Sequence, residues 1–218
     1  MAGHLRIYFY QPSYPDFKTG GELYQNKLFE YFKSRNENVF IIGDRNQSRL
    51  KKILSGFKIF RKIRSGGVLI CTNNECLHFY FPLILRKLFF PKVKVFLIVH
   101  HLIQSLSHKN ILNHIESVFI KKSDFIITIS NATKNELKRC ELSNNEISVV
   151  NPGTDIKPIK SERINNRILF AGNIEERKGL HILINALTQI NNEYEMIIVG
   201  EYNEHDKYFK SLNHLNNN

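Results

Sequence analysis

The sequence is poor in the residues that mark several classes of protein. It has no tryptophan, and its 218 residues include only 3 cysteines, 6 prolines and 11 glycines. These numbers exclude a disulfide scaffold and a collagen-like chain. Cys71, Cys76 and Cys140 are odd in number and form no Cys-x-x-Cys pair, so we predict neither a zinc site nor a disulfide framework. We interpret them as small buried apolar side chains in a protein of a reducing compartment.

Long hydrophobic runs are also missing. No stretch reaches the roughly 18 apolar residues of a membrane-spanning helix, and the longest candidate, Phe79–Phe90, is interrupted by Pro82, Arg86 and Lys87. The N-terminal segment lacks the basic start and the small-residue cleavage site of a signal peptide. We therefore expect a cytoplasmic protein.

Acidic residues are outnumbered, with 20 Asp and Glu against 31 Lys and Arg and a formal net charge of +11. This excess favours an anionic partner: nucleic acid, a phosphorylated ligand or an anionic membrane surface. One predicted helix, Arg49–Arg64, carries many of the cations outside its apolar stripe. It can lie on anionic lipid, or it can pack on a sheet with its cations solvated, and we favour the second interpretation. The cations are Lys51, Lys52, Lys58, Arg61, Lys62 and Arg64.

Short apolar runs alternate with amphipathic segments over the first 150 residues. We expect strands at Leu5–Tyr10, Asn38–Ile42, Val68–Thr72, Val93–Val99, Phe125–Ser130 and Ile147–Val150. We expect helices at Glu22–Arg35, Arg49–Arg64, Glu75–Phe90, Asn110–Lys121 and Ala132–Cys140. Strands such as VKVFLIV are nearly continuous apolar runs, which is typical of parallel strands buried on both faces. The pattern predicts an α/β fold with a doubly wound parallel sheet.

The pattern breaks at Asn151–Ser161, which has two prolines, one glycine and no periodicity. We interpret this segment as a linker after a first domain at 1–150. A second domain then begins within 162–218, with a strand at Arg167–Ala171, a helix at Gly179–Ile190 and a strand at Glu195–Val199. Beyond Gly200 the chain is polar, so we expect this second domain to be incomplete.

Two segments at predicted strand ends of the first domain are candidate ligand sites. Gly20 and Gly21 lie between the first strand and the first helix, where free N–H groups and the helix dipole favour an anion. A tight turn is the alternative. His100 and His101 follow the fourth strand, at the sheet edge that lines the ligand crevice in this fold class. Ordinary loop histidines are the alternative there.

Two further strand ends carry candidate motifs. Ser130 and Asn131 follow the fifth strand, and we interpret them as the cap of the next helix. The segment Gly172–Gly179 follows the first strand of the second domain and places Arg177 and Lys178 at a helix start. Both cations suit phosphate oxygens, so this turn is a candidate diphosphate site, with a solvated charged turn as the alternative.

In this order and at these spacings, six segments resemble the retaining family-4 glycosyltransferases of the GT-B architecture. They are TGGELYQNKLFEYF, FLIVHHL, SDFIITISNATKNEL, ISVVNPGTDI, ILFAGNIEERKGLHILINAL and MIIVGE. The resemblance implies two Rossmann-like domains facing a cleft, with the acceptor on the N-terminal domain and a nucleotide-sugar donor on the C-terminal one. It implies sugar transfer to an acceptor hydroxyl with retention, without a metal or any cofactor besides the donor.

The resemblance also implies a setting: cell-surface glycan or glycolipid synthesis on a glycan or lipid-linked acceptor. We expect peripheral association with the inner face of the membrane and no nucleic-acid partner.

The resemblance assigns roles to four residues, Gly20, Gly21, His100 and Lys178, and bears on three more, His101, Asn173 and Arg177. Gly20 and Gly21 match the glycine loop near the donor phosphates, and His100 matches a histidine near the transferred sugar. His101, the second catalytic candidate, stands where an acidic residue is common. Lys178 matches the lysine that neutralises the donor diphosphate. Asn173 replaces a usual arginine, and we infer that Arg177 supplies the missing charge.

The sequence departs from the family in one larger respect. The family carries a Glu-x7-Glu motif that contacts the donor, and here Glu193 and Glu201 have that spacing but flank a predicted strand, before the region where the motif belongs. We interpret the match as a coincidence and expect a truncated chain or one half of a split transferase. A non-catalytic remnant, a nucleotide-sugar epimerase and a nucleic-acid binder are the alternatives. The sequence does not show the carboxylate set that an epimerase would need. It also shows no RNP, zinc-finger or helix-turn-helix signature of a nucleic-acid binder.

Overall fold

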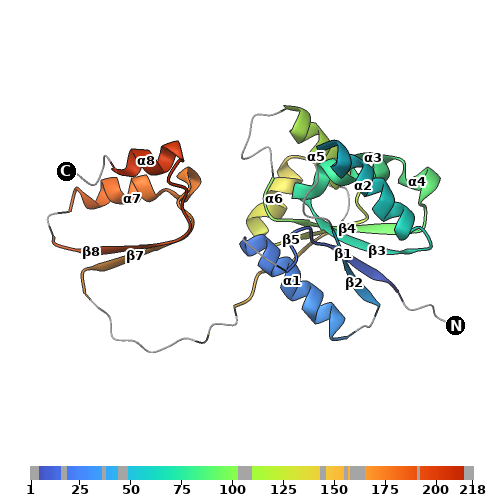
Figure 1. The fold of residues 1–218 in the computed structure, drawn as a ribbon, viewed down its shortest axis with the longest axis horizontal. Helices are drawn as coiled ribbons and strands as arrows, with labels where there is room; N and C mark the ends of the chain where they lie inside the picture. Colours follow the sequence, from blue (N-terminus) through green and yellow to red (C-terminus); the bar gives the residue numbers. More distant parts are fainter. Residues whose placement is uncertain are drawn as a thin grey trace. The chain divides into compact units, whose positions relative to one another are not determined.

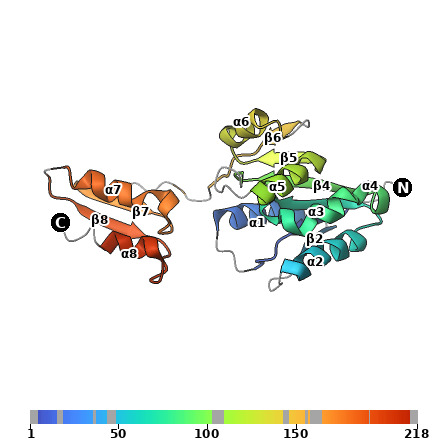
Figure 2. The same cartoon turned by 90° about the horizontal axis from the view of Figure 1, so that it is seen from above.

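The chain divides into two compact units in the computed structural model: unit 1, Met1–Thr154, and unit 2, Asp155–Asn218. The boundary falls within the segment that the sequence predicts as a linker, of which residues 151–154 and 157 are described. The structure describes residues 5–15, 19–35, 38–43, 49–102, 110–142, 146–154, 157, 165–190 and 192–213 (Figures 1 and 2).

Unit 1 is built on a parallel six-stranded sheet with the order β2-β1-β3-β4-β5-β6. The strands are β1 (Ile7–Tyr10), β2 (Val39–Ile42), β3 (Gly67–Thr72), β4 (Val93–Val99), β5 (Phe125–Thr128) and β6 (Ile147–Val149). Every residue of β1 and β3 is buried, as expected for strands covered on both faces. The predicted α/β fold with a doubly wound parallel sheet is confirmed.

Helices cover both faces of this sheet. They are α1 (Gly20–Lys33), α2 (Arg49–Lys62), α3 (Cys76–Ile84), α4 (Arg86–Phe89), α5 (Asn110–Lys122) and α6 (Asn131–Arg139). Figure 1 shows α1 on one face and α2, α3 and α5 on the other. Phe60, Phe79 and Phe119, one from each of these three helices, are fully buried in the larger apolar core. Phe29 of α1 packs against Phe9 of β1 in the smaller core.

The predicted helix Glu75–Phe90 is wrong in one respect, because it is not continuous. A 3-10 turn, η1 (Asn73–Glu75), precedes α3, and α3 ends at Ile84, with Leu85 as its C-cap, before α4 begins. Pro82 lies inside α3 and leaves the carbonyl of His78 without its usual helical donor. Gly56 of α2 lies against that carbonyl, where any side chain would collide with it. The two helices therefore cross closely at Gly56.

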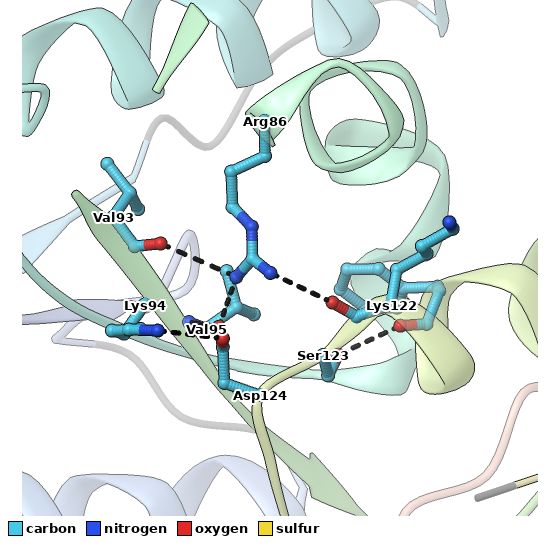
Figure 3. A network of polar contacts seen from close by, with 8 residues as sticks. Arg86, Val93, Lys94, Val95, Lys122, Ser123 and Asp124 are labelled. Atoms are coloured by element: carbon cyan, nitrogen blue, oxygen red, sulfur yellow. Dashed lines mark hydrogen bonds and ion pairs between the residues drawn. The ribbon is translucent and has the colours of Figure 1, made fainter. Parts of the chain in front are cut away.

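A polar network ties α4 to the amino ends of β4 and β5 (Figure 3). The carboxylate of Asp124 accepts from the guanidinium of Arg86 and from the backbone N–H of Val95, 2.8 Å away. Lys94 Nζ lies 3.4 Å from its second oxygen. The side chains of Arg86 and Asp124 are only 12% and 15% exposed, so this ion pair is largely shielded from water. It lies at the opposite end of the strands from His100.

Two of the three cysteines match the interpretation as buried side chains. Cys71 and Cys76 are buried and Cys140 is half-buried, and all three are free thiols. Burial raises the pKa of Cys71 well above its usual value and raises the pKa of Cys76 to about 11. These two thiols therefore stay protonated and unreactive near neutral pH.

Unit 2 pairs two parallel strands, β7 (Arg167–Ala171) and β8 (Glu195–Val199). A 3-10 turn, η3 (Glu176–Lys178), leads into α7 (Leu180–Leu187), and α8 (Lys207–Asn213) follows β8. We predicted no helix after Gly200, so α8 is a correction. The hydroxyl of Tyr208 in α8 accepts from the backbone N–H of His181 in α7, 3.2 Å away. The short helix α8 is therefore held by a contact with a distant part of the chain.

Candidate functional site

A cavity of about 180 Å³ opens at the carboxyl edge of the unit 1 sheet. Its walls come from the segments that follow β1, β3 and β4 and from the first turn of α1, and they include Gln11, Gly21, Thr72, Glu75 and His100. Within the sheet, β2 lies next to β1 on one side and β3 lies next to β1 on the other side, so the strand order reverses at β1. This is the switch point at which open α/β sheets bind their ligands.

His100 is one of the predicted residues that form this wall. Burial lowers the pKa of its imidazole, and the neighbouring His101 lowers it further, so the ring is held neutral. Its Nε2 edge packs against Gly21, where an added Cβ would lie 3.2 Å from Nε2. The ring of Tyr24 meets it edge-on at a centroid distance of 5.9 Å. Two motifs that the sequence offers separately, the glycine pair and the histidine, are therefore in direct contact.

His101, the second catalytic candidate, has an exposed side chain that does not line the cavity. Its backbone carbonyl accepts from the side-chain amide of Asn73, 2.7 Å away. The same amide donates to Glu116 of α5 at 2.6 Å, and both Asn73 and Glu116 are almost completely buried. This pair fixes the turn after β4 and thereby the backbone of the histidine pair. No pattern in the sequence indicates this pair, because the two residues lie 43 positions apart.

The first turn of α1 is closed by a capping box. The Thr19 hydroxyl accepts from the backbone N–H of Glu22, and the Glu22 carboxylate accepts from the backbone N–H of Thr19 at 2.9 Å. Gly20 is exposed, with open space where its Cβ would lie. The two glycines thus face different surroundings: Gly20 is open and Gly21 is packed on His100.

The interpretation of Ser130 as a helix cap is confirmed. Its hydroxyl accepts from the backbone N–H of Thr133, 3.2 Å away, at the start of α6. Thr133 in turn donates from its hydroxyl to the carbonyl of His100 at 3.2 Å. The cap therefore supports the backbone of the candidate histidine.

In unit 2, Asn173, Arg177 and Lys178 all lie in the turn between β7 and α7, where the sequence places them. The guanidinium Nε of Arg177 lies 2.7 Å from the Glu175 carboxylate, so its charge is partly neutralised. Lys178 has no carboxylate partner among the residues that the structure describes. Gly179 has a positive φ of 73° and serves as the N-cap of α7 without a side chain. Lys178 is thus the cation of this turn that is free to meet an anion.

Within the described part of the chain, no group of three or more metal-ligating side chains comes together. None of the described helices has the length and apolar character needed to cross a membrane.

Three comparisons place the chain among known proteins. A model of the family described as glycosyltransferase family 4 matches residues 25–157, more than half of the chain. No protein with a curated description matches significantly. Among solved structures, the chain is similar to Alr3699/HepE of Anabaena, crystallised in complex with UDP and glucose, with a TM-score of 0.69 and 16% identity. The match covers 97% of this chain but 65% of that chain, and at this identity it shows the GT-B-like fold.

Proposed function

Because the chain belongs to glycosyltransferase family 4, we propose that it transfers a sugar from a nucleotide-diphosphate sugar to an acceptor hydroxyl, with retention at the anomeric carbon. The observation that carries the proposal is the cavity at the sheet's switch point, whose wall includes His100 and Glu75 from within the matched segment. The UDP and glucose bound by the similar Anabaena protein support a nucleotide-sugar donor.

In this proposal unit 1 holds the acceptor and unit 2 holds the donor diphosphate. Lys178 neutralises the diphosphate as it leaves, and Asn173 and Arg177 contact it from the same turn. On unit 1, the exposed Gly20, which is not part of the cavity wall, is the contact that we propose for the donor phosphates. His100, held neutral by burial, contacts the transferred sugar without adding a charge. His101 is the second candidate for such a contact from the same turn.

The proposal is tested with the purified chain, a panel of UDP-, GDP- and ADP-sugars, and neutral methyl glycosides as acceptors. We expect release of nucleoside diphosphate that depends on the acceptor, and NMR of the product gives the anomeric configuration. Loss of turnover in His100→Ala, with binding of the nucleotide retained, would support the assigned site. Absence of both nucleotide binding and transfer would contradict the proposal.

A second candidate function is one part of a transferase assembled from two polypeptides. It is favoured by apolar side chains that unit 2 leaves exposed: Leu169, Ile182 and Val199 are 63%, 64% and 56% exposed. Single exposed apolar residues are common, and we take three of this size in a small unit as support for a contact with a second polypeptide. Transfer that appears only when a polypeptide carrying the Glu-x7-Glu motif is added would establish this version. Full transfer by the chain alone would exclude it.

We also propose that the protein acts in cell-surface glycan or glycolipid synthesis, at the inner face of the membrane. A groove of about 500 Å³ between α2 and α4 combines apolar and cationic walls, including Leu54, Arg61, Arg64 and Phe89. Leu54 and Phe89 are 62% and 59% exposed, and Leu88 beside the groove is 75% exposed. Exposed apolar side chains among cations are typical of surfaces that lie on anionic lipid. Lys51 and Lys52, which the sequence assigns to this surface, have side chains outside the described residues.

A further inference from the structure

The cavity of unit 1 has a charge pattern that does not suit a phosphate. Two carboxylates, those of Glu22 and Glu75, belong to its wall, and no lysine or arginine does so among the described residues. An anion inside the cavity would face carboxylates without a compensating cation. The space of about 180 Å³ equals about six water molecules at ~30 Å³ each. It therefore suits one small, uncharged, polar group.

The wall also contains a polar side chain that the fold itself does not use. Gln11 is only 5% exposed, yet both its amide nitrogen and its amide oxygen lack a hydrogen-bond partner among the described residues. A buried amide without partners is rare in folded proteins. Gln25, a second buried glutamine of the same wall, donates to the carbonyl of Tyr10 at 3.0 Å. Gln25 is thus part of the fold, whereas Gln11 has one donor group and one acceptor left for a ligand.

The two carboxylates of the wall differ in the same way. Glu22 is occupied by the capping box, where it accepts from both the backbone and the hydroxyl of Thr19. The Glu75 Oε2 atom lies 2.8 Å from Nδ1 of His78, a residue 4% exposed, and the carboxylate is 18% exposed. His78 lies against one oxygen of Glu75, and the other oxygen can accept a hydrogen bond from a ligand hydroxyl.

We infer that Gln11 and Glu75 are specificity-determining residues that select an uncharged, hydroxyl-rich acceptor end, such as a neutral sugar ring, and reject an acidic one. The inference deepens the proposed function and rests on it for the identity of the site as the acceptor side. A vicinal diol can satisfy both groups of the Gln11 amide at once, and a third hydroxyl donates to Glu75. A carboxylate or phosphate in the same place would be repelled by Glu75.

The test uses the full chain, ¹⁵N-labelled, and four neutral probes: the methyl glycosides of glucose, galactose, mannose and N-acetylglucosamine. The methyl glycosides of glucuronic and galacturonic acid are the matched acidic probes. We expect at least one neutral probe to shift the side-chain NH₂ resonances of Gln11, and the acidic counterpart to bind at least tenfold more weakly. Shifts confined to residues on the other side of Gln11, such as Lys58 and Lys62 in the wall of a second cavity, would overturn the inference.

Three variants separate recognition from folding. Gln11→Met removes an amide that the fold does not use, so we expect an unchanged or higher melting temperature and at least tenfold weaker binding of the neutral probe. Gln25→Met is the matched control and should lower the melting temperature, because it loses the bond to Tyr10. Glu75→Gln should weaken the neutral probe about tenfold and reduce the discrimination against the acidic one, because a charged acceptor is replaced by a neutral one.

Binding of UDP to the same samples distinguishes this inference from the proposed function. UDP binding with no response to any neutral probe would overturn the acceptor inference and leave the transferase proposal standing. Loss of neutral-probe binding in Glu75→Gln with UDP binding intact supports the inference. A lower melting temperature in Gln11→Met, with unchanged probe binding, would show that this side chain is structural and would refute its role in recognition.

Discussion

The contact between Gly21 and His100 gives the sharpest test of the site's geometry. Gly20 and Gly21 are neighbours in the first turn of α1, and neither has a positive φ, so both accept alanine without backbone strain. An added Cβ at Gly21 would lie 3.2 Å from the His100 Nε2 atom, tighter than ordinary van der Waals contact. At Gly20 no atom lies within 4 Å of the added Cβ. The two substitutions therefore differ mainly in the histidine contact.

The expected magnitudes follow from two opposing effects. Glycine to alanine at a compatible position stabilises by about 0.4–1 kcal/mol, because the unfolded chain loses conformational freedom. Overpacking a buried contact costs roughly 1–3 kcal/mol. We therefore expect Gly20→Ala to raise the free energy of unfolding by the first amount. Gly21→Ala should gain the same stabilisation but also pay the cost of overpacking. The free energies of unfolding of the two variants should therefore differ by about 1–3 kcal/mol.

The assay is urea unfolding followed by circular dichroism, with a third variant, His100→Ala, and the double variant Gly21→Ala/His100→Ala. If the imidazole causes the strain, the alanine at position 21 becomes stabilising once the ring is gone, with a coupling of about 0.5–3 kcal/mol. Gly20→Ala should show no coupling to His100→Ala. Equal stabilisation by Gly20→Ala and Gly21→Ala, or zero coupling in both cycles, would refute the packing described for this site.

Three further predictions concern other parts of the molecule. Asp124→Ala should lower the free energy of unfolding by about 3 kcal/mol, because it leaves the shielded Arg86 without its carboxylate partner. The side chain of Lys94 is 58% exposed, so Lys94→Ala should lower it by less than ~1 kcal/mol. Equal losses for the two variants in urea titrations would contradict this prediction. Lys178→Ala should weaken UDP binding measured by calorimetry at least about tenfold, the value of a charge-assisted contact, whereas the control Lys207→Ala in α8 should not; an unchanged dissociation constant would contradict the role of Lys178. The chain should co-sediment with anionic but not neutral vesicles, and Lys58→Glu/Arg61→Glu/Lys62→Glu should reduce this more than tenfold at ~1 kcal/mol per cation; equal binding to both vesicle types would contradict it.

The regular elements could be predicted from the sequence where one apolar pattern decides the structure. The bounds of β4 and β7, Val93–Val99 and Arg167–Ala171, agree residue for residue, because short and mainly apolar runs have few alternatives to a strand. The break at Leu85 could not be predicted, since no turn residue marks it. The helix α8 was missed because its position depends on Tyr208 bonding to His181, 27 residues away. The local sequence pattern therefore predicts a helix or strand only where its formation does not depend on contacts with distant residues.

The candidate site divides in the same way. The rule that the carboxyl ends of parallel strands line the ligand crevice identified His100 as a candidate, although it could not show that its ring touches Gly21. The capping box Thr19–Glu22 has a recognisable sequence signature, but we interpret that segment from the sequence as a candidate anion site, with a tight turn as the alternative. Gln11 and Glu75 were not predicted, because what distinguishes them is the absence or presence of a partner: Gln11 has none among the described residues, and Glu75 has His78. Such a property belongs to the folded chain and has no pattern in the sequence.

The buried state of His100 also makes a prediction about pH. Burial, and secondarily the charge of His101, lowers the pKa of its imidazole below the usual 6.5. The unfolded chain then binds a proton at this position that the folded chain does not, so the contribution to stability is fully present above pH 6.5 and is lost as the pH falls through the folded pKa. Long-range ¹H–¹⁵N spectra should show one imidazole titrating below 6.5 that disappears in His100→Asn. The same variant should lose less stability than the wild-type protein between pH 6.5 and 5. A His100 resonance that titrates above 6.5 would show that the ring is not shielded, and the packing of Gly21 against it would then have to be abandoned as well.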